Sequence, residues 1–403
     1  MTNTLLTFLG KGRDDPKTGY RTATYRFPNG DDATTPFFGL ALAEQLKPKV
    51  VVILGTAGSM WGVLIEHFSQ HDRHEELRLE LMEAESSASV TQALLDRVTP
   101  LLQESIAHEV ILRLIPHGQE PHEQIGILEV IAQTLGKQQA RLHLDITHGF
   151  RHLAAIGFLS AAMLERLRSQ LQVEALWYGA LEMSQNNTTP VIRLDGLSAV
   201  QRWVSALDHF DASGNYGVFA PLLEADGLPG DKARCLIDAA FYETTTQVPN
   251  AARSLRTLLP ELNTPLTGAS ALFQTQLKER LQWAQGDNLA HQQRLLAERA
   301  LKRGDLLRAA ILGLEALITR QTVAAGMDPY NYEDREREDE QLREEIKNGQ
   351  HPDWLKVAYW DMKTLRNSMA HGTQPRKGRL QQLMKNPERL AAFLQSNLSR
   401  LHT

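Results

Sequence analysis

The 403-residue chain contains one cysteine, Cys235, and this scarcity excludes an intrachain disulfide. Such a composition is compatible with a reducing compartment, so we expect a cytoplasmic protein. Long apolar runs are also missing, since no stretch approaches the ~18 residues that a membrane helix needs, and we expect no membrane partner. The first residues, MTNTLLTFLGKG, have neither a basic leader nor a long apolar segment, which is typical of a first strand and not of an export signal.

Positive charge is not in excess either. A formal charge of −5 gives no basis for coating nucleic acid nonspecifically, so a site for a polyanion has to be a local basic pocket. His, Asp and Glu clusters with metal-ligand spacing are absent from the second half of the sequence, and we expect no metal and no cofactor. A chain of this length exceeds one ordinary core, which predicts at least two domains.

The first half of the sequence alternates between strand and helix patterns. Its clearest strand is VVVIL at residues 50–54, a β-branched run typical of a parallel strand buried on both faces. This alternation predicts a doubly wound, mostly parallel, Rossmann-like α/β sheet over residues 1–197. The predicted strands are residues 4–9, 20–27, 50–54, 110–115, 142–146, 173–181 and 190–194, and the predicted helices are residues 36–46, 71–107, 120–135 and 150–164.

The chain is organised around DITHGFRH, residues 145–152, which joins a strand to a helix through a polar turn. Apolar residues alternate up to Ile146 and recur at helical spacing from Phe150, so the period changes at residues 147–149. Such a turn presents free N–H groups and the positive end of a helix dipole, and anions bind there readily.

We expect Thr147 to be the N-cap of this helix and Gly149 to let a ligand approach the backbone. His148, Arg151 and His152 can add hydrogen bonds or positive charge toward phosphates. The competing interpretation is a capped helix start with polar surface residues, which any open α/β sheet contains.

Two further turns of small residues follow predicted strands. One is basic, and the other offers hydroxyl groups and close backbone approach to a phosphate or ribose. In the second turn Trp61 either stacks on a base or packs beneath the turn, and we favour packing. The candidate ligand-binding residues are Gly10, Lys11, Gly12, Gly55, Thr56, Ala57, Gly58, Ser59, Met60, Trp61, Asp145, Thr147, His148, Gly149 and Arg151.

From residue 197 onward the strand pattern disappears and an all-helical region is predicted. Its predicted helices are residues 199–210, 231–242, 270–283, 292–303, 305–321, 353–369 and 387–401. The mixed-charge run EDREREDEQLREE at residues 333–345 favours a solvated helix or loop over a binding surface.

Near the end of this region stands LRNSMAHG, residues 365–372. Gly372 is a typical helix C-cap, which places His371 at a helix carboxyl end. An arginine followed five places later by a histidine is a weak signal by itself, and Arg366 can equally pair with a carboxylate such as Asp361. Five residues on a regular helix turn through ~500° and rise ~7.5 Å, so Arg366 and His371 of one chain do not converge on one atom. Two chains together would form such a site.

Taken together, these stretches resemble a known family. DITHGFRH, the LGKG turn at residues 9–12, the GTAGSMW turn at residues 55–61 and RNSMAH in the helical half are similar to the ribonucleases of type III CRISPR systems. Those proteins join a CRISPR-associated Rossmann-fold (CARF) domain to a HEPN domain. The resemblance implies a CARF sensor over residues 1–197, a helical linker region over 198–290 and an all-α HEPN nuclease domain over 291–403.

The resemblance also implies an activity. A cyclic oligoadenylate, expected here as cyclic tetra-adenylate, would activate a homodimer or higher even-numbered homo-oligomer that cuts single-stranded RNA without a metal. The implied catalytic residues are Arg366, Asn367 and His371. The chemistry suits them, because a histidine can move a proton and an arginine can stabilise charge on a phosphate.

Two other functions remain open at this point. A ligand-sensing regulator whose helical half binds DNA or a protein would cut nothing. A nucleotide-dependent oxidoreductase fits less well, because GKGRDD at residues 10–15 lacks the third glycine of a dinucleotide fingerprint and does not open a helix.

Overall fold

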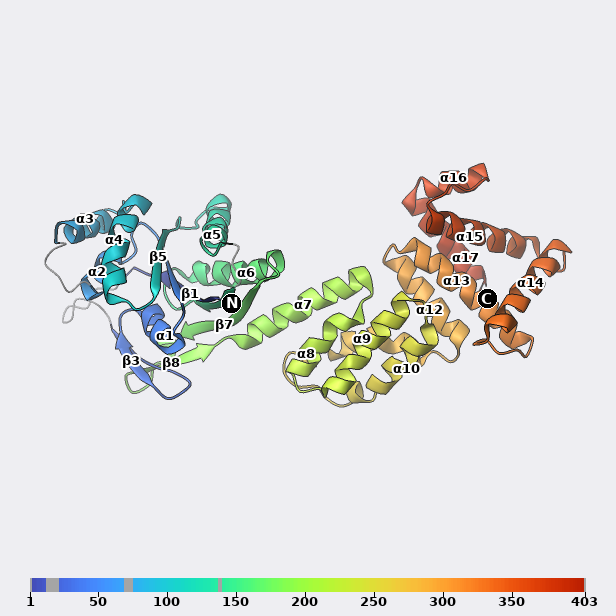
Figure 1. Ribbon diagram of the computed structural model, residues 1–403, viewed down its shortest axis with the longest axis horizontal. Helices are drawn as coiled ribbons and strands as arrows, with labels where there is room; N and C mark the ends of the chain where they lie inside the picture. The colour runs from blue at the N-terminus through green and yellow to red at the C-terminus, as the bar shows by residue number, and fades with distance from the viewer. Residues whose placement is uncertain (1, 12–21, 69–74, 137–139, 402–403) are drawn as a thin grey trace. The chain divides into compact units, whose positions relative to one another are not determined.

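The computed structural model describes residues 2–11, 22–68, 75–136 and 140–401. The chain divides into two compact units, Met1–Ser198 and Ala199–Thr403, and the division falls within helix α7, Asp195–Ser213 (Figure 1). The predicted end of the α/β domain at residue 197 lies one residue before this division.

The first unit is built on a sheet of eight described strands in the order β3-β2-β8-β7-β6-β1-β4-β5. The five strands from β7 to β5 run parallel to one another, and β2 is parallel to β8. The two antiparallel pairs are β7 with β8 and β2 with β3. A mostly parallel α/β sheet is therefore confirmed. The strands are β1 Thr2–Leu9, β2 Ala23–Arg26, β3 Asp32–Thr35, β4 Val50–Gly55, β5 Glu109–Leu114, β6 Ala140–Asp145, β7 Leu171–Gly179 and β8 Thr188–Arg193.

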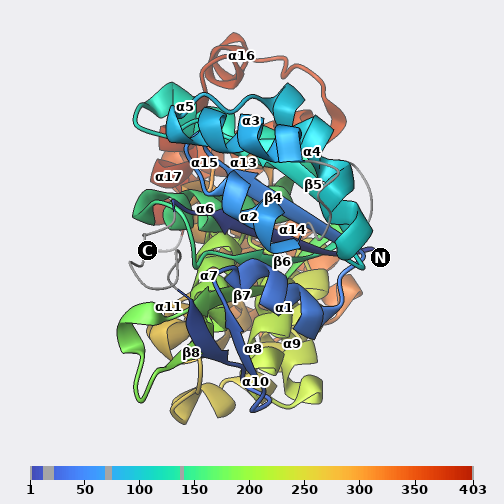
Figure 2. The same ribbon diagram turned by 90° about the vertical axis from the view of Figure 1, so that its left-hand side faces the viewer.

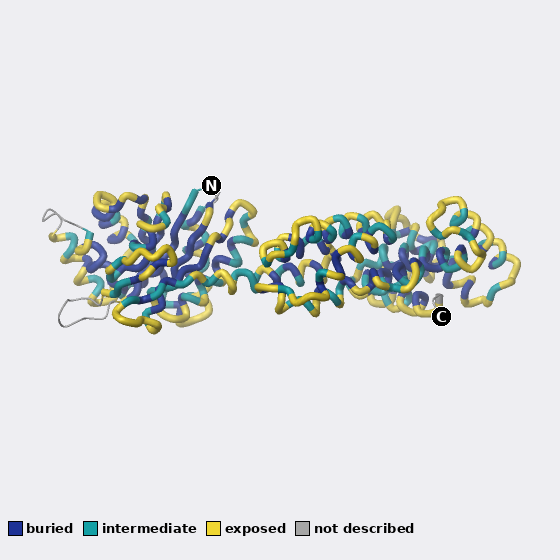
Figure 3. Tube along the Cα trace, turned by 90° about the horizontal axis from the view of Figure 1, so that it is seen from below, coloured by how far each residue is buried: buried dark blue, intermediate teal, exposed yellow. Residues whose placement is uncertain are grey.

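Helices cover both faces of this sheet (Figure 2), and much of its strands is buried (Figure 3). Apolar strand residues pack into a separate cluster on each face. One face packs against α1, α2, α3 and α4 through Phe38, Trp61, Leu81 and Leu95. The other packs against α5 and α6. The helices are α1 Phe38–Leu46, α2 Trp61–Phe68, α3 Glu75–Ser86, α4 Gln92–Ser105, α5 Pro121–Thr134 and α6 Arg151–Leu167, and a 3-10 turn, η2, spans Leu181–Met183.

The register of the central strands brings their carboxyl ends to one edge. Leu9 of β1 lies opposite Gly55 of β4, and Thr7 of β1 lies opposite Asp145 of β6. Because β6, β1 and β4 are neighbours and parallel, the turns that follow them meet at the same edge of the sheet.

Some elements of this unit differ from the predicted ones. Strand β3 was not predicted, because its sequence DATT lacks an apolar alternation. The predicted helix over 71–107 is two helices, since Ala88 adopts a left-handed backbone (φ 52°) and Thr91 caps α4 by accepting a hydrogen bond from Leu94 N. Residues 12–21, including Gly12, lie outside the described residues.

The second unit is helical throughout the residues that the structure describes after α7. Its helices are α8 Ala220–Ala225, α9 Gly230–Thr244, α10 Val248–Leu258, α11 Ser270–Leu281, α12 Leu289–Lys302, α13 Leu306–Ala324, α14 Tyr332–Lys347, α15 Asp353–His371, α16 Gly378–Met384 and α17 Pro387–Leu401, with the 3-10 turns η3 Tyr216–Phe219, η4 Glu261–Asn263 and η5 Gln282–Gln285. Helices α8, α10 and α16 were not predicted. The mixed-charge run is helix α14, with Leu342 and Ile346 buried on one side.

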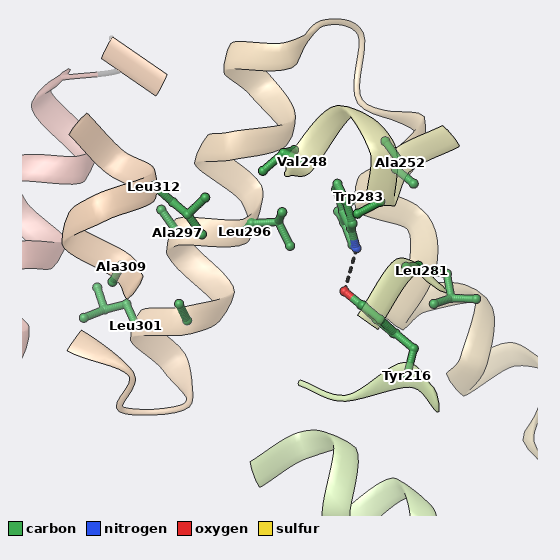
Figure 4. Close-up of a cluster of buried hydrophobic side chains, with 14 of the residues drawn as sticks. Tyr216, Val248, Ala252, Leu281, Trp283, Leu296, Ala297, Leu301, Ala309 and Leu312 are labelled. Carbon is green, nitrogen blue, oxygen red and sulfur yellow. Dashed lines mark hydrogen bonds between the residues drawn. The ribbon is translucent and has the colours of Figure 1, made fainter. Parts of the chain in front are cut away.

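One apolar core extends from Trp203 to Leu398 in this unit. Figure 4 shows part of it, where Trp283 Nε1 donates to Tyr216 Oη at 2.8 Å between the packed side chains. Because residues on both sides of position 290 share this core, the structure does not set residues 198–290 apart as a linker. Within the described ranges, no helix is both long and apolar enough to cross a membrane.

Candidate functional site

The three predicted turns contact one another at the carboxyl edge of the sheet. Met60 N donates a hydrogen bond to Gly10 O at 3.0 Å, which joins the first turn to the second. A Cβ atom on Gly10 would lie 3.0 Å from Gly149 N, so the first turn also touches the third and needs a glycine there. The structure therefore brings the sequence-predicted turns together, apart from Gly12.

Asp145 lies beneath this edge and not on its surface. Its side chain is fully buried; Thr7 Oγ1 donates to Oδ2 at 2.6 Å and Thr147 N donates to Oδ1 at 2.8 Å. Burial raises the pKa of Asp145 to about 6, against the opposing effect of these hydrogen bonds. Both carboxylate oxygens are thus bonded within the chain, and Asp145 holds the turn in place.

Thr147 has a different role from the predicted one. Helix α6 begins four residues after Thr147, at Arg151, because Gly149 takes a left-handed conformation (φ +95°) that delays the helix start. The N-cap is Phe150, whose side chain makes no capping hydrogen bond. Thr147 Oγ1 instead accepts from Gly179 N at 2.7 Å and ties the turn to β7. The prediction of Thr147 as the N-cap was wrong.

His148 contributes a hydrogen bond but no positive charge. Its Nε2 accepts from Phe38 N at 3.3 Å, which links the turn to the start of α1. Burial lowers the pKa of His148 to about 4, so the ring is neutral near pH 7. The expected positive charge on this side chain is therefore corrected, and the cation of the motif is Arg151, which is exposed.

The second turn keeps most of its polar groups inside. Trp61 is 1% exposed, and its Nε1 donates to Thr56 O at 2.8 Å. A Cβ atom on Gly55 would lie 2.4 Å from Trp61 Cζ2, so the glycine makes room for the indole. Trp61 thus packs beneath the turn, as favoured above, and does not offer a face to a base.

The hydroxyl groups of this turn are also occupied. Ser59 Oγ donates to Leu9 O at 2.8 Å and accepts from Thr56 N at 2.9 Å. Thr56, Ser59 and Met60 are buried. The predicted hydroxyl bonds to a ligand are replaced by bonds within the chain, which leaves the half-buried Ala57 and Gly58 as the accessible part of this turn.

Several candidate residues do reach the surface at this edge. Lys11, Gly149 and Arg151 are exposed, and Thr147 and His148 are half-buried. Two cations beside a helix start without a side-chain cap suit an anion, because the first amides of a helix point out of it. The arrangement can hold a phosphate group, with no covalent chemistry required of these side chains.

Two contacts at this edge were not expected from the sequence, which named His152 but neither Glu85 nor His117. Glu85 Oε2 accepts from Gly62 N at 2.7 Å in the first turn of α2, and burial raises the pKa of this carboxyl group. His152 Nε2 lies 2.7 Å from His117 O, and the His152 ring stacks on that of Phe150 with centroids 5.7 Å apart. The signal for the His117 contact was its position just after the end of strand β5.

The predicted catalytic residues lie at the end of α15, a continuous helix up to His371. Asn367 and His371 are exposed, and Arg366 is half-buried. Gly372 ends the helix in the left-handed conformation (φ 63°), and its N–H donates to Ser368 O. The predicted C-cap is confirmed, and His371 lies at the carboxyl end of the helix as expected.

Arg366 is not paired with Asp361, so that competing interpretation is wrong. The buried Asp361 carboxylate is held instead by Lys377, at 3.0 Å, and by Arg379. Arg366 Nε is buried and has no hydrogen-bond partner in the part of the chain that the structure describes. A buried guanidinium nitrogen without an acceptor is costly. Arg78, Arg303 and Arg343 each have one as well, so what sets Arg366 apart is its place on the helix that ends at His371.

The continuity of α15 also fixes how Arg366 and His371 are related. Five residues of a regular helix turn through ~500° and rise ~7.5 Å, so the two side chains leave the helix in different directions. Groups of three or more His, Cys, Asp or Glu side chains able to hold a metal ion are not found among the described residues. Metal independence stays a prediction.

Comparison with known proteins shows which proteins this chain is similar to. Residues 4–182 match the family model for the CARF domain of the CRISPR system endoribonuclease Csx1. A CRISPR-associated protein of Methanocaldococcus jannaschii is 24% identical over 288 residues, which are 65% of this chain and 44% of that protein. The chain thus matches less than half the length of this curated relative.

A solved structure, Enterococcus italicus Csm6 bound to cyclic hexa-2'-fluoro-hexa-dAMP, is 12% identical, with a TM-score of 0.40 over 99% of this chain and 94% of that one. The family match covers strands β2 to β7, most of β1, helices α1 to α6 and all three turns at the carboxyl edge, and it ends before β8. Residues 4–182, within the α/β unit, are therefore similar to the CARF domain of the CRISPR-associated Csx1 family.

Proposed function

We propose that the chain is a cytoplasmic endoribonuclease of type III CRISPR defence, in which a cyclic oligoadenylate activates a HEPN domain that cuts single-stranded RNA without a metal. One observation carries the nuclease part of this proposal. Arg366 keeps a buried nitrogen without a partner on the helix that ends at the exposed His371. The half-buried Arg366 guanidinium can donate hydrogen bonds to a phosphate from outside the chain.

The proposed chemistry uses three side chains of α15. His371 takes the proton of a ribose 2'-OH or gives one to the leaving 5'-oxygen. Arg366 stabilises the charge that develops on the phosphate, and Asn367 orients the reacting groups. Since Arg366 and His371 point away from each other on one helix, the complete site takes residues from two chains of a homodimer or a higher even-numbered homo-oligomer.

The activator is proposed to bind at the carboxyl edge of the sheet. Lys11 and Arg151 meet its phosphates, while Gly58, Thr147 and Gly149 lie close to it. A ring with an even number of units shares the two-fold symmetry of a dimer, and cyclic tetra-adenylate remains the expected one. One activator would then bind per two chains.

Activation requires that the ligand prefers the active arrangement of the dimer. A shift from 1:99 to 99:1 needs roughly 10⁴-fold preference, or about 5.5 kcal/mol. Each charge-assisted hydrogen bond supplies about 1.5–3 kcal/mol. A few phosphate contacts per subunit therefore suffice to drive the change.

The test is a cleavage assay with end-labelled single-stranded RNA, with and without cyclic oligoadenylates of four and six units. We expect cleavage that depends on one of these rings. Tight ring binding without cleavage under any condition would leave a ligand-sensing regulator in place of the nuclease. Calorimetry combined with solution mass tests the dimer, and one ring per single chain contradicts the shared site.

A further inference from the structure

A second polar pocket lies in the helical unit, apart from the residues assigned above. Its volume is about 430 Å³, and it lies between helix α10, the start of α12 and the loop before α14. Ala252 and Leu289 are its buried apolar residues, and Figure 4 shows Ala252 above the core near Trp283. Nothing in the proposed activator or cleavage sites uses this pocket.

Two arginines of α10 give the pocket its charge. Arg253 and Arg256 are three residues apart, so they lie on the same side of the helix. Arg256 Nε donates to Ala284 O at 2.8 Å, and Arg253 Nη1 donates to Asn250 Oδ1 at 3.2 Å. A guanidinium has five N–H donors, so each arginine is held in position with donors to spare.

The remaining lining offers an aromatic ring and amide groups. Tyr330 is 67% exposed, and its backbone N–H donates to Asp328 Oδ1 at 2.9 Å, which orders the loop that carries it. Asn288 and Gln292 line the same pocket, and Gln292 Nε2 donates to Gly286 O at 3.0 Å. Guanidinium groups, an exposed aromatic face and amides are the groups that bind phosphate, base face and base edge in single-stranded nucleic acid.

We propose that this pocket holds one nucleotide of the single-stranded RNA substrate, with Arg253 and Arg256 on the phosphodiester and Tyr330 stacked on the base. The proposal rests on the proposed RNA substrate. Two arginines and Asp287, also in the lining, leave one net positive charge. That charge matches a phosphodiester, whereas a free nucleoside triphosphate carries several more negative charges.

The experiment measures binding separately from cleavage. A fluorescent single-stranded RNA with 2'-O-methyl groups lacks the 2'-OH that the proposed cleavage uses, so it reports affinity alone. Fluorescence anisotropy with the full chain compares Tyr330→Ala with the matched control Tyr332→Ala, since Tyr332 is 74% exposed and does not line the pocket. Arg253→Gln is compared with Arg337→Gln, an exposed arginine of the mixed-charge helix α14.

We expect Tyr330→Ala to weaken binding about tenfold or more, because stacking of one base contributes that much. Arg253→Gln should lower the slope of log affinity against log salt by about 0.7, the effect of one phosphate contact on a single strand. Unchanged affinity in both variants, or equal losses in the two controls, overturns the proposal. ATP binding is measured in the same way as a competing ligand. If Tyr330→Ala or Arg253→Gln weakens ATP binding and leaves RNA affinity unchanged, the proposal is also overturned.

The two proposals fail separately. If wild-type protein binds the methylated RNA through Tyr330 but never cuts unmodified RNA, the nuclease proposal fails and the pocket stands. If unmodified RNA is cut with the same KM by wild type and Tyr330→Ala, the pocket proposal fails and the nuclease stands.

Discussion

The carboxyl edge of the sheet and the end of α15 both carry polar motifs, but they differ in how many polar groups are already bonded within the chain. At the edge, Asp145, Ser59 and Thr147 all bond to neighbouring turns or strands. On α15, Arg366 Nε has no partner among the described residues, and His371 is exposed. The edge motif thus builds a rigid surface, whereas the α15 motif presents reactive groups. Substitutions at the two places should therefore fail in different ways.

The largest effect is expected on α15. His371→Ala or Arg366→Ala should lower the RNA cleavage rate at saturating activator by about 10²- to 10³-fold, because each removes a group that acts on the reacting phosphate. Thermal unfolding and activator affinity should stay near wild type. Arg376→Ala, an exposed arginine in the loop after α15, is the control. If both α15 variants cleave RNA at the wild-type rate, Arg366 and His371 are not the catalytic residues.

A large effect on stability is expected at the edge. The folded chain holds the Asp145 proton up to about pH 6, whereas the unfolded chain releases it near pH 4. The unfolding free energy should therefore fall by roughly 3 kcal/mol as pH rises through this window and stay level above it, by the linkage of proton binding to folding. Asp145→Asn should lack this contribution.

Denaturant titrations at several pH values measure this difference between wild type and Asp145→Asn. Glu129→Gln, at an exposed position of α5, is the control and should follow wild type. A pH dependence that is the same in wild type and Asp145→Asn would mean that the buried carboxyl group does not titrate in this window.

A smaller effect is expected for the exposed cations of the edge. Lys11→Ala and Arg151→Ala should raise the activator concentration for half-maximal activity about 10- to 100-fold, because each loses one charge-assisted hydrogen bond to a phosphate. The fully activated rate should not change. Arg141→Ala is the control, since this exposed arginine lies at the opposite end of β6. Activation curves that coincide for all four proteins would place the activator elsewhere.

Removal of metal ions is expected to have no effect on cleavage. Cleavage should survive excess EDTA, because the proposed chemistry uses a histidine and an arginine in place of a metal. The assay compares rates with EDTA and with added Mg²⁺ or Mn²⁺. If EDTA inhibits cleavage and added Mg²⁺ or Mn²⁺ restores it, the reaction needs a metal ion in addition to the side chains of α15.

The sequence predicted the arrangement of the sheet better than the state of its side chains. The β-branched run of β4 predicted a central strand, and parallel neighbours then had to bring their turns to one edge. Whether Ser59 or Thr147 faces a ligand or bonds to Leu9 or Gly179 depends on contacts between distant segments, which no local pattern contains.

The helical unit shows the same limit. Gly372 predicted the end of α15 because the left-handed C-cap is a local requirement. The pairing of Asp361 with Lys377 and Arg379 depends on how the loop after α15 folds back, and the sequence alone left Arg366 as an equal partner. The unpredicted helix α10 begins with Val-Pro-Asn, in which the proline obscured a helix start that it in fact favours.

The burial of Trp61 and Asp145 has a consequence for how relatives of this chain are recognised. Residues that hold a turn together are constrained by architecture, so a search with DITHGFRH or GTAGSMW retrieves proteins that build this edge, whatever ring they bind. On the proposed function, discrimination between ring sizes falls to exposed positions outside these two motifs, such as Lys11, whose side chain makes none of the contacts described above that hold the turns together. Two proteins with identical motifs can therefore answer different signals.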